Sequence, residues 1–294
     1  DLMHSGQTLI SALQLGQLKA ESLQAMAKKK ITGLAYEFIE DKVGGMPIIR
    51  AMSEIAGSTV LPIASEYLST ANNGKGIILG GITGVPPTKV IIIGAGTVAE
   101  FVARAALGLG AEVQVFDNHI YKLRRIKHLV GHQIYTSTID TITLSEALRS
   151  ADVVIGALRA EKGRARHVVT DEMVANMKPD SLIIDLSIDQ GGCIETSEIT
   201  TLSKPVFRKH DVIHYCVPNV ASRVAHTATT ALSNIFTPTI LRAAEEGGVE
   251  AMIFSHKWFM KGVYTYKGGL TNEYVARKFG LKYKNIELLM AARF

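Results

Sequence analysis

Short apolar runs alternate with amphipathic stretches through the middle of the chain. The apolar runs favour strands buried in a sheet, and they cover residues 90–93, 113–116, 133–138, 152–158, 181–187 and 212–217. Between them, apolar residues recur at helical spacing over residues 98–109, 120–129, 144–151 and 171–177. This alternation of strand and helix predicts a doubly wound parallel sheet from about Lys89 to Val217.

Two of these helices have a predicted apolar face. The first is expected to pack through a stripe of Val98, Phe101, Val102, Ala105 and Leu109. The second is expected to pack through Ile120, Leu123 and either Ile126 or Leu129.

The segments on either side of this sheet have a different pattern. On the N-terminal side we expect a helix over 22–30, a strand over 31–40 and a long helix over 47–72 that Pro62 interrupts. On the C-terminal side the strand signals stop after residue 221, and a helix follows that Pro238 kinks or divides. The tail from residue 257 is expected to be irregular and then helical.

One glycine-rich stretch links the first strand of the predicted sheet to the next helix. Gly94, Gly96 and Ala99 fit the pattern G-x-G-x-x-G/A. Gly94 permits a tight turn, Gly96 lets the backbone approach a pyrophosphate, and Ala99 keeps the helix close to the sheet. The helix begins near Thr97 and Val98, where free N–H groups and the positive end of the helix dipole favour a phosphate.

An acid stands at the end of the second strand, about 20 residues after the glycine turn. This acid, Asp117, is placed to bind a ribose 2′-OH, and its charge disfavours a 2′-phosphate, so the pattern favours NAD over NADP. FAD and SAM sites share much of this pattern, and a plain glycine-rich turn is the structural alternative. We predict a Rossmann-type NAD-binding domain over residues 48–227, inserted into a second, split α/β substrate domain. That second domain comprises residues 1–47 and a helical segment over residues 228–294.

Composition excludes several classes of protein. The 294 residues are 47% hydrophobic and 20% charged with a net charge of +5, which indicates a globular protein. The basic clusters at 28–30 and 122–128 lack interleaved aromatic residues, so they favour solvated helix faces over a nucleic-acid site. Cys193 and Cys216 show no zinc spacing, and no metal site is predicted. No apolar run approaches the ~20 residues of a membrane span and no signal peptide is present, so we expect a cytoplasmic protein.

Three candidate site residues follow predicted strands. Ligands of open α/β sheets bind at the carboxyl ends of the strands. Asp189, in a glycine-rich loop, is a candidate acid/base, or alternatively a turn-capping acid. Asn219 can bond a carboxamide, or it can be a turn residue after a proline, and Leu158 follows another strand. Cys193 fits buried packing better than nucleophilic catalysis, and His226 fits a structural role at a helix start. Neither G-x-S-x-G nor a Walker lysine is present, so hydrolase and kinase functions lack support.

On these residues the chain resembles the alanine dehydrogenase family, which also includes the NAD-binding subunit of proton-translocating transhydrogenase. The most specific run is DLSIDQGGCIETS, and the others are AMSEIAG, GGITGVPPTKVIIIGAGTV, VFDNHIYKLRR, DVVIGAL, HYCVPNVAS and ALSNIFTP. The resemblance implies reversible oxidative deamination of L-alanine with NAD to give pyruvate and ammonium. It also implies a homo-oligomer, a hexamer. From the charge pattern and the lack of a long apolar run we expect neither a nucleic-acid nor a membrane partner.

The resemblance also implies roles for individual residues. Asp189 matches an aspartate that works at the reacting carbon, where it positions water or ammonia and assists proton transfer. Ser53 matches a residue that contacts the pyrophosphate, Asp117 one that binds the adenosine ribose, and Lys122 one near that ribose. The nicotinamide side is expected to be lined by Leu158, Ile188 and Asn219.

Two departures from the family pattern keep alternatives open. The family's N-terminal segment, with an arginine and a lysine that hold the substrate, is expected to be absent from this chain. Gln14 stands where many members carry a catalytic histidine, and glutamine can bond a keto oxygen but cannot titrate near neutral pH. The alternatives are a transhydrogenase-type NAD-binding subunit and a non-catalytic NAD-binding protein. The stretch DNHIYKLRR and the compact segment 131–151 favour the dehydrogenase.

Overall fold

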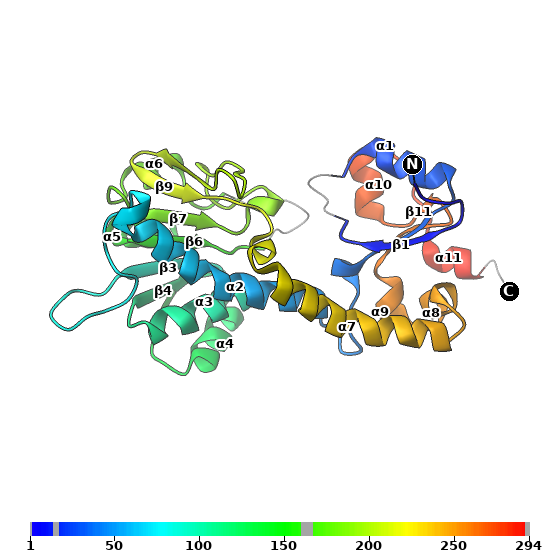
Figure 1. Cartoon of the computed structure of the whole chain (residues 1–294), viewed down its shortest axis with the longest axis horizontal. Coiled ribbons are helices and arrows are strands. Elements are labelled where there is room, and N and C mark those ends of the chain that lie inside the picture. The colour runs from blue at the N-terminus through cyan, green and yellow to red at the C-terminus, as the bar shows by residue number, and fades with distance from the viewer. Residues whose placement is uncertain (1, 14–17, 160–166, 292–294) are drawn as a thin grey trace. The chain divides into compact units, whose positions relative to one another are not determined.

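The chain folds into two compact units, each built around its own sheet (Figure 1). The structure is a computed structural model that describes residues 2–13, 18–159 and 167–291. The larger unit is Met52–Ala228, and the smaller unit combines Asp1–Ala51 with Thr229–Phe294.

The sheet of the larger unit has the strand order β5-β4-β3-β6-β7-β9-β8. Neighbouring strands are parallel, except that β8 pairs antiparallel with β9. The apolar runs do not reveal β8, because it lies at the sheet edge and is only partly buried. The predicted doubly wound sheet is confirmed, with strands β3 (Lys89–Ile93), β4 (Glu112–Phe116), β5 (Tyr135–Ser137), β6 (Val153–Gly156), β7 (Leu182–Asp185), β8 (Val206–Lys209) and β9 (Val212–Tyr215).

Helices cover both faces of this sheet, which is why its central strands read as unbroken apolar runs. Val90 and Ile92 of β3 face the core under α2, α3 and α4, whereas Ile91 and Ile93 face the core under α5 and α6. These helices are α2 (Pro47–Leu68), α3 (Thr97–Gly108), α4 (Ile120–Val130), α5 (Thr141–Ser150) and α6 (Asp171–Ala175).

Helix α2 corrects the expectation of an interruption at Pro62, because it runs through that residue. An interior proline costs a helix about 3 kcal/mol, since it removes one hydrogen bond and crowds the preceding turn. The residues around it are nearly inaccessible to solvent, and their burial offsets that cost. They are Val60, Leu61, Ile63 and Ala64.

The predicted apolar stripe of α3 is also partly wrong. Leu109 is 49% exposed, and Val98, Phe101 and Ala105 are only partly buried. Val102 is fully buried as predicted, and the other fully buried apolar residues of the helix are Ala99, Ala103 and Ala106. Alanine side chains let the helix approach β3 closely, so the small residues occupy the inner face and the larger ones lie at its margin. In α4 the buried residues are Leu123, Ile126 and Val130, whereas Ile120 and Leu129 are exposed.

The smaller unit has a four-stranded sheet in the order β1-β2-β10-β11. Its strands are β1 (Thr8–Ser11), β2 (Thr32–Ala35), β10 (Val263–Tyr266) and β11 (Gly269–Leu270). Strand β10 pairs antiparallel with β2, so the expectation that strands stop after residue 221 is wrong. The partner of β10 lies more than 200 residues away in sequence, and a short run such as VYTY becomes a strand only when that partner is present. The predicted strand over 31–40 is also shorter, because Tyr36–Phe38 forms a 3-10 turn.

Helices complete this unit, and two helices, α2 and α7, have residues in the ranges of both units. Helix α7 (Ala225–Glu245) continues through Pro238 without dividing. The remaining helices are α1 (Ala20–Lys28), α8 (Val249–Ser255), α9 (Lys257–Met260), α10 (Glu273–Phe279) and α11 (Ile286–Ala291).

A buried histidine in β9 predicts how stability depends on pH. The Nδ1 of His214 lies 3.0 Å from the Val212 carbonyl oxygen, so Nδ1–H donates and Nε2 accepts from the Thr196 hydroxyl at 2.8 Å. Burial lowers the pKa of His214 from 6.5 to about 4. Between these values the unfolded chain binds a proton that the folded chain does not, so the free energy of unfolding falls as pH falls, by about 3 kcal/mol in total.

We expect His214→Gln to flatten the pH dependence of urea unfolding below pH 6.5, the ordinary histidine value. His132→Gln, at an exposed position of the same unit, is the matched control and should keep the wild-type slope. Equal slopes for both variants would contradict the prediction.

Candidate functional site

The glycine turn lies at the point where the strand order of the larger sheet reverses. From β3 the chain continues outward through β4 and β5, and β6 then pairs on the other side of β3. Gly94 has a φ of 111°, and its N–H donates to the Phe116 carbonyl oxygen at 2.6 Å. A Cβ at Gly94 would lie 2.5 Å from the Ala157 carbonyl oxygen, just beyond β6. Both the backbone angle and the close approach therefore require glycine here.

The second glycine of the turn has open space in front of it. Gly96 is the N-cap residue of α3 and has no side chain to cap the helix, so the first N–H groups at Thr97 and Val98 lack a capping partner. A Cβ at Gly96 would meet no atom within 4 Å. Free N–H groups, a positive dipole end and open space suit the pyrophosphate of a dinucleotide. Ala99 is fully buried, as the close approach of helix and sheet requires.

Substitution by alanine is expected to affect stability at Gly94 and NAD binding at Gly96. We expect Gly94→Ala to reduce stability by about 1–3 kcal/mol from backbone strain, with the clash at Ala157 adding to it. Gly96→Ala should leave the urea midpoint unchanged but weaken NAD binding, because its methyl group points into the open space. Calorimetric titration with NAD checks both variants, and wild-type affinity in Gly96→Ala would contradict the assignment.

Asp117 lies at the end of β4 and is tied to the glycine turn. Its Oδ2 accepts from the Ala95 N–H at 2.8 Å, and its Oδ1 accepts from the His119 N–H at 2.8 Å. The His119 ring nitrogen Nδ1 lies 2.9 Å from the same Oδ1, and the Lys122 ammonium lies 4.0 Å from Oδ2. Burial raises the pKa of Asp117, but these hydrogen bonds and Lys122 outweigh it, so the pKa lies below the ordinary value. The carboxylate is therefore ionised at neutral pH and retains acceptor capacity on Oδ2.

Ser53 lies on α2, whose packing brings it toward the same turn. Ser53 is one turn before Gly57 and shares its helix face. A Cβ at Gly57 would lie 2.7 Å from the Val98 carbonyl oxygen in the first turn of α3. Arg125 is a neighbour that the motif alone does not reveal, and its guanidinium donates to the Ala95 carbonyl oxygen at 3.3 Å.

A second group of predicted residues meets at the carboxyl ends of β6, β7 and β9. Asp189 lies in the 3-10 turn Ile188–Gln190, and its Oδ2 accepts from the Asn219 N–H at 3.1 Å. The Ser187 hydroxyl donates to the Leu158 carbonyl oxygen at 2.8 Å, which ties the loop after β6 to the same turn. Asn219 has a φ of 52°, a conformation that asparagine tolerates. Ile188, the first residue of this turn, is buried.

Asp189 has the properties of an acid/base group. Its side chain keeps a solvent-exposed surface, yet the surrounding protein atoms desolvate it and raise its pKa above the ordinary value. The Asn219 N–H lowers the pKa, but not enough to cancel that effect. A carboxyl group with a raised pKa is better matched to proton transfer near neutral pH.

Asp185 supports this turn, and the sequence analysis did not single it out. Its Oδ1 accepts from the Ser187 N–H at 2.9 Å, and its Oδ2 accepts from Cys193 and Ile194 at 3.0 and 3.3 Å. Burial raises the pKa of Asp185 despite these bonds. The buried Cys193 thiol lies 3.7 Å from Oδ1, and burial together with the Asp185 charge raises its pKa well above the ordinary value, which disfavours a nucleophilic thiolate. The sequence feature that could have identified Asp185 is its position as an acid at the end of the apolar strand β7.

Comparison with known proteins shows the family of the chain. Residues 1–56 match the family described as "Alanine dehydrogenase/PNT, N-terminal domain", and residues 61–273 match "Alanine dehydrogenase/PNT, C-terminal domain". The chain is 38% identical over 289 residues to the alanine dehydrogenase of Mycolicibacterium smegmatis, covering 98% of this chain and 77% of the relative. It is 36% identical over 288 residues to that of Methanococcus maripaludis, covering 98% and 77%.

The chain belongs to the alanine dehydrogenase/PNT family.

Solved structures place the fold in the same family. An L-alanine dehydrogenase matches with a TM-score of 0.88 and 32% identity, covering 95% of this chain and 77% of that one. A transhydrogenase from Sinorhizobium meliloti matches with a TM-score of 0.74 and 23% identity, over 92% and 74% of the two chains, which shows the fold alone. The predicted family, the Rossmann-type fold, the NAD-dependent oxidoreductase class and NAD as cofactor are confirmed.

Two other residues considered in the sequence are located as follows in this alanine dehydrogenase/PNT member. Gln14 lies outside the described residues. His226 is in the first turn of α7.

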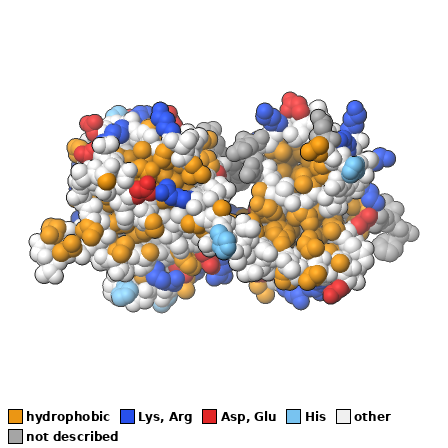
Figure 2. Space-filling view, viewed as in Figure 1, with side chains coloured by type: hydrophobic (Ala, Val, Ile, Leu, Met, Phe, Trp, Pro, Cys, Tyr) orange, Lys and Arg blue, Asp and Glu red, His pale blue; other side chains and the backbone are white. Residues whose placement is uncertain are grey.

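Among the residues that the structure describes, no helix is long and apolar enough to cross a membrane, and no cluster of His, Cys, Asp and Glu is arranged to hold a metal. Lysine and arginine side chains are dispersed over the face shown in Figure 2, with acidic side chains between them.

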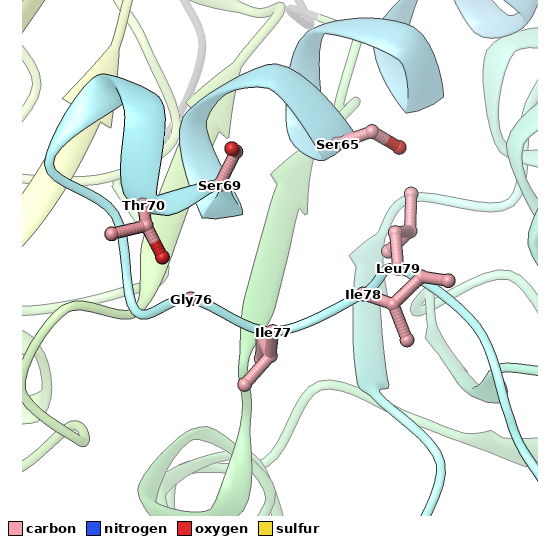
Figure 3. Close-up of a pocket in the computed structure, with 7 residues that line it drawn as sticks. All are labelled: Ser65, Ser69, Thr70, Gly76, Ile77, Ile78 and Leu79. Atoms are coloured by element: carbon pink, nitrogen blue, oxygen red, sulfur yellow. The ribbon is translucent and has the colours of Figure 1, made fainter.

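A cavity of about 310 Å³ lies at the opposite end of the larger sheet from the glycine turn. It is lined by the hydroxyl residues Ser65, Ser69 and Thr70 and by the segment 76–79 (Figure 3). The chain next to that segment packs against the last turn of α3, since the Gly81 N–H donates to the Leu109 carbonyl oxygen at 3.1 Å. The cavity has no charged lining residue and contains none of the predicted site residues.

Proposed function

We propose that the protein catalyses the reversible, NAD-dependent oxidative deamination of L-alanine to pyruvate and ammonium. The observation that carries this is the contact of Asp189 with Asn219 at the carboxyl ends of the strands, in a chain 38% identical to an alanine dehydrogenase. The contact places a carboxyl group of raised pKa on the same sheet as the glycine turn.

The residues of the larger unit divide between cofactor and substrate. Bound NAD would accept a hydride from the substrate carbon. The α3 N-terminus beside Gly96, with Ser53, would hold the pyrophosphate, whereas Asp117 and Lys122 would bind the adenosine ribose. The nicotinamide side would be lined by Leu158, Ile188 and Asn219.

Asp189 would handle protons at the reacting carbon. In deamination, water would add to the imine formed from alanine, and the Asp189 carboxylate would take the proton that the water releases. Asp189 would then return this proton to the nitrogen of the carbinolamine, whose C–N bond breaks so that ammonia leaves, while the hydroxyl group loses its proton and becomes the keto group of pyruvate. In the reverse direction the protonated carboxyl group returns a proton as water leaves the same carbon. Gln14 would bond the keto oxygen in this scheme.

Further parts of the proposal rest on the family. We assign residues 1–47 and 228–294 to the substrate domain and residues 48–227 to the NAD-binding domain. The protein is proposed to act in the cytoplasm as a homo-oligomer, a hexamer, on small molecules and without nucleic acid or membrane. Light scattering of the intact protein tests the assembly.

The deciding experiment is NADH formation by the intact protein, followed by absorbance, with L-alanine, glycine, serine and valine in turn. We expect turnover with L-alanine and a preference for NAD over NADP, because Asp117 repels a 2′-phosphate. NAD binding without turnover on any of these amino acids would overturn the catalytic proposal and support a non-catalytic NAD-binding role. Absence of NAD binding would overturn the cofactor site as well.

A further inference from the structure

Two lysines of the smaller unit occupy backbone positions that favour glycine or asparagine. Lys30 has a φ of 53° and follows the C-terminal end of α1, where a left-handed residue usually closes the helix. Lys267 has a φ of 47° and begins the turn between β10 and β11, followed by Gly268 at 81°. A side chain at either position carries backbone strain that glycine avoids. Nothing in the two turns themselves requires lysine.

The packing of the two turns brings both lysines to one pocket. The Gly268 N–H donates to the Ile31 carbonyl oxygen at 3.0 Å, and the Lys267 N–H donates to the Thr32 hydroxyl oxygen at 3.2 Å. A Cβ at Gly268 would lie 2.5 Å from the Ala27 carbonyl oxygen, so the turns are in close contact. The pocket between them has a volume of about 160 Å³ and is lined by Gly6, Thr8, Lys30, Thr32, Glu250, Ile253 and Lys267.

The pocket carries an excess of positive charge. The Lys267 ammonium lies 2.9 Å from Glu250, but their side chains are 53% and 43% exposed, so this ion pair contributes little. Glu250 also accepts from the Tyr266 hydroxyl. The Lys30 ammonium makes no ion pair or hydrogen bond with any residue in the described ranges. The pocket is therefore lined by two lysines and two threonines against one glutamate, and the Lys267 ammonium also lies 5.4 Å from the centroid of the Tyr266 ring.

We propose that this pocket binds a small oxyanion, a phosphate or a carboxylate, between Lys30 and Lys267. Its hydroxyl residues open β1 and β2, so the pocket lies at the amino ends of these parallel strands. All of its lining residues belong to the smaller unit, whereas Asp189 and the glycine turn belong to the larger one. None of its lining residues is among those proposed for catalysis or for cofactor binding.

Titration of the intact protein with inorganic phosphate and, separately, with acetate, a carboxylate that is not a substrate of the proposed reaction, tests the site. Calorimetry and thermal unfolding are measured at constant ionic strength, with and without saturating NAD, so that binding at the glycine turn is recognised by its loss when NAD is present. We expect saturable binding that NAD does not abolish. A stronger response to phosphate or to acetate shows whether the pocket prefers a phosphate or a carboxylate.

Asparagine substitutions separate binding from folding. Lys30→Asn and Lys267→Asn should each weaken oxyanion binding at least about tenfold, the equivalent of 1.4 kcal/mol. They should not lower the Tm, because asparagine tolerates the left-handed backbone. Lys282→Asn, an exposed lysine outside the pocket, is the control for net charge and should bind like wild type.

Binding that does not saturate, or binding that both pocket variants retain, would overturn the proposal. The pocket variants should form NADH from L-alanine at the wild-type rate in a buffer that contains neither phosphate nor acetate. Loss of oxyanion binding is therefore distinguishable from failure of the proposed catalytic function.

Discussion

Replacing Asp189 with asparagine is expected to lower kcat for L-alanine-dependent NADH formation by about 10²–10⁴-fold. Asparagine keeps the shape of the side chain and can still accept from the Asn219 N–H, but it cannot exchange a proton. The affinity for NAD should stay near the wild-type value, because the glycine turn is untouched. Steady-state kinetics and calorimetric titration with NAD measure the two effects separately.

The pH profile adds a second test of Asp189. If its carboxylate is the base, wild-type kcat/KM falls as pH decreases through a pKa that lies above the ordinary aspartate value, because desolvation raises it. That limb should be absent from the residual activity of Asp189→Asn. Asp211→Asn is the matched control, since it removes an exposed charge in the same unit at a left-handed position that suits asparagine. An unchanged kcat in Asp189→Asn would contradict the assignment.

Asp185→Ala is expected to have the largest effect on stability. The substitution leaves the N–H groups of Ser187, Cys193 and Ile194 without their acceptor inside the protein. Each buried donor that loses its partner costs about 1–3 kcal/mol, so a loss of several kcal/mol in the free energy of unfolding is expected. Urea unfolding measures this loss.

The same substitution should also impair catalysis, because Asp185 positions the turn that carries Asp189. We expect kcat to fall in the folded fraction of Asp185→Ala while the affinity for NAD is largely kept. Asp185→Asn retains one acceptor oxygen and should be intermediate in both measurements. A urea midpoint and a kcat that both match wild type in Asp185→Ala would refute the positioning role.

Local sequence patterns were sufficient to predict the part of the larger unit that is proposed to bind NAD. The strand, glycine turn and helix from residue 89 to 108 are close in sequence, and each is specified by short-range rules of burial, backbone freedom and helix spacing. Asp117 was identified in the same way, since its distance from the turn is set by one helix and one strand. The fold class and the family followed from these residues and the loop around Asp189.

Other features depended on contacts between residues far apart in the chain. Strand β10 forms because β2 supplies a partner more than 200 residues away, and α2 tolerates Pro62 because burial of its neighbours offsets the lost hydrogen bond. The inner face of α3 is lined with alanines because the helix must approach β3, which its periodicity does not reveal.

Short-range patterns in the chain were enough to predict the parallel strands and helices of the larger unit, the glycine turn and the residue types available for chemistry, because these follow from neighbouring residues. Which of these residues meet depends on the three-dimensional fold. It placed the Asn219 N–H on Asp189, and it set Lys30 beside Lys267 in one pocket. It also gave Asp185 its buried donors. Such contacts depend on sheet order and on the packing of distant turns, and no local pattern encodes either.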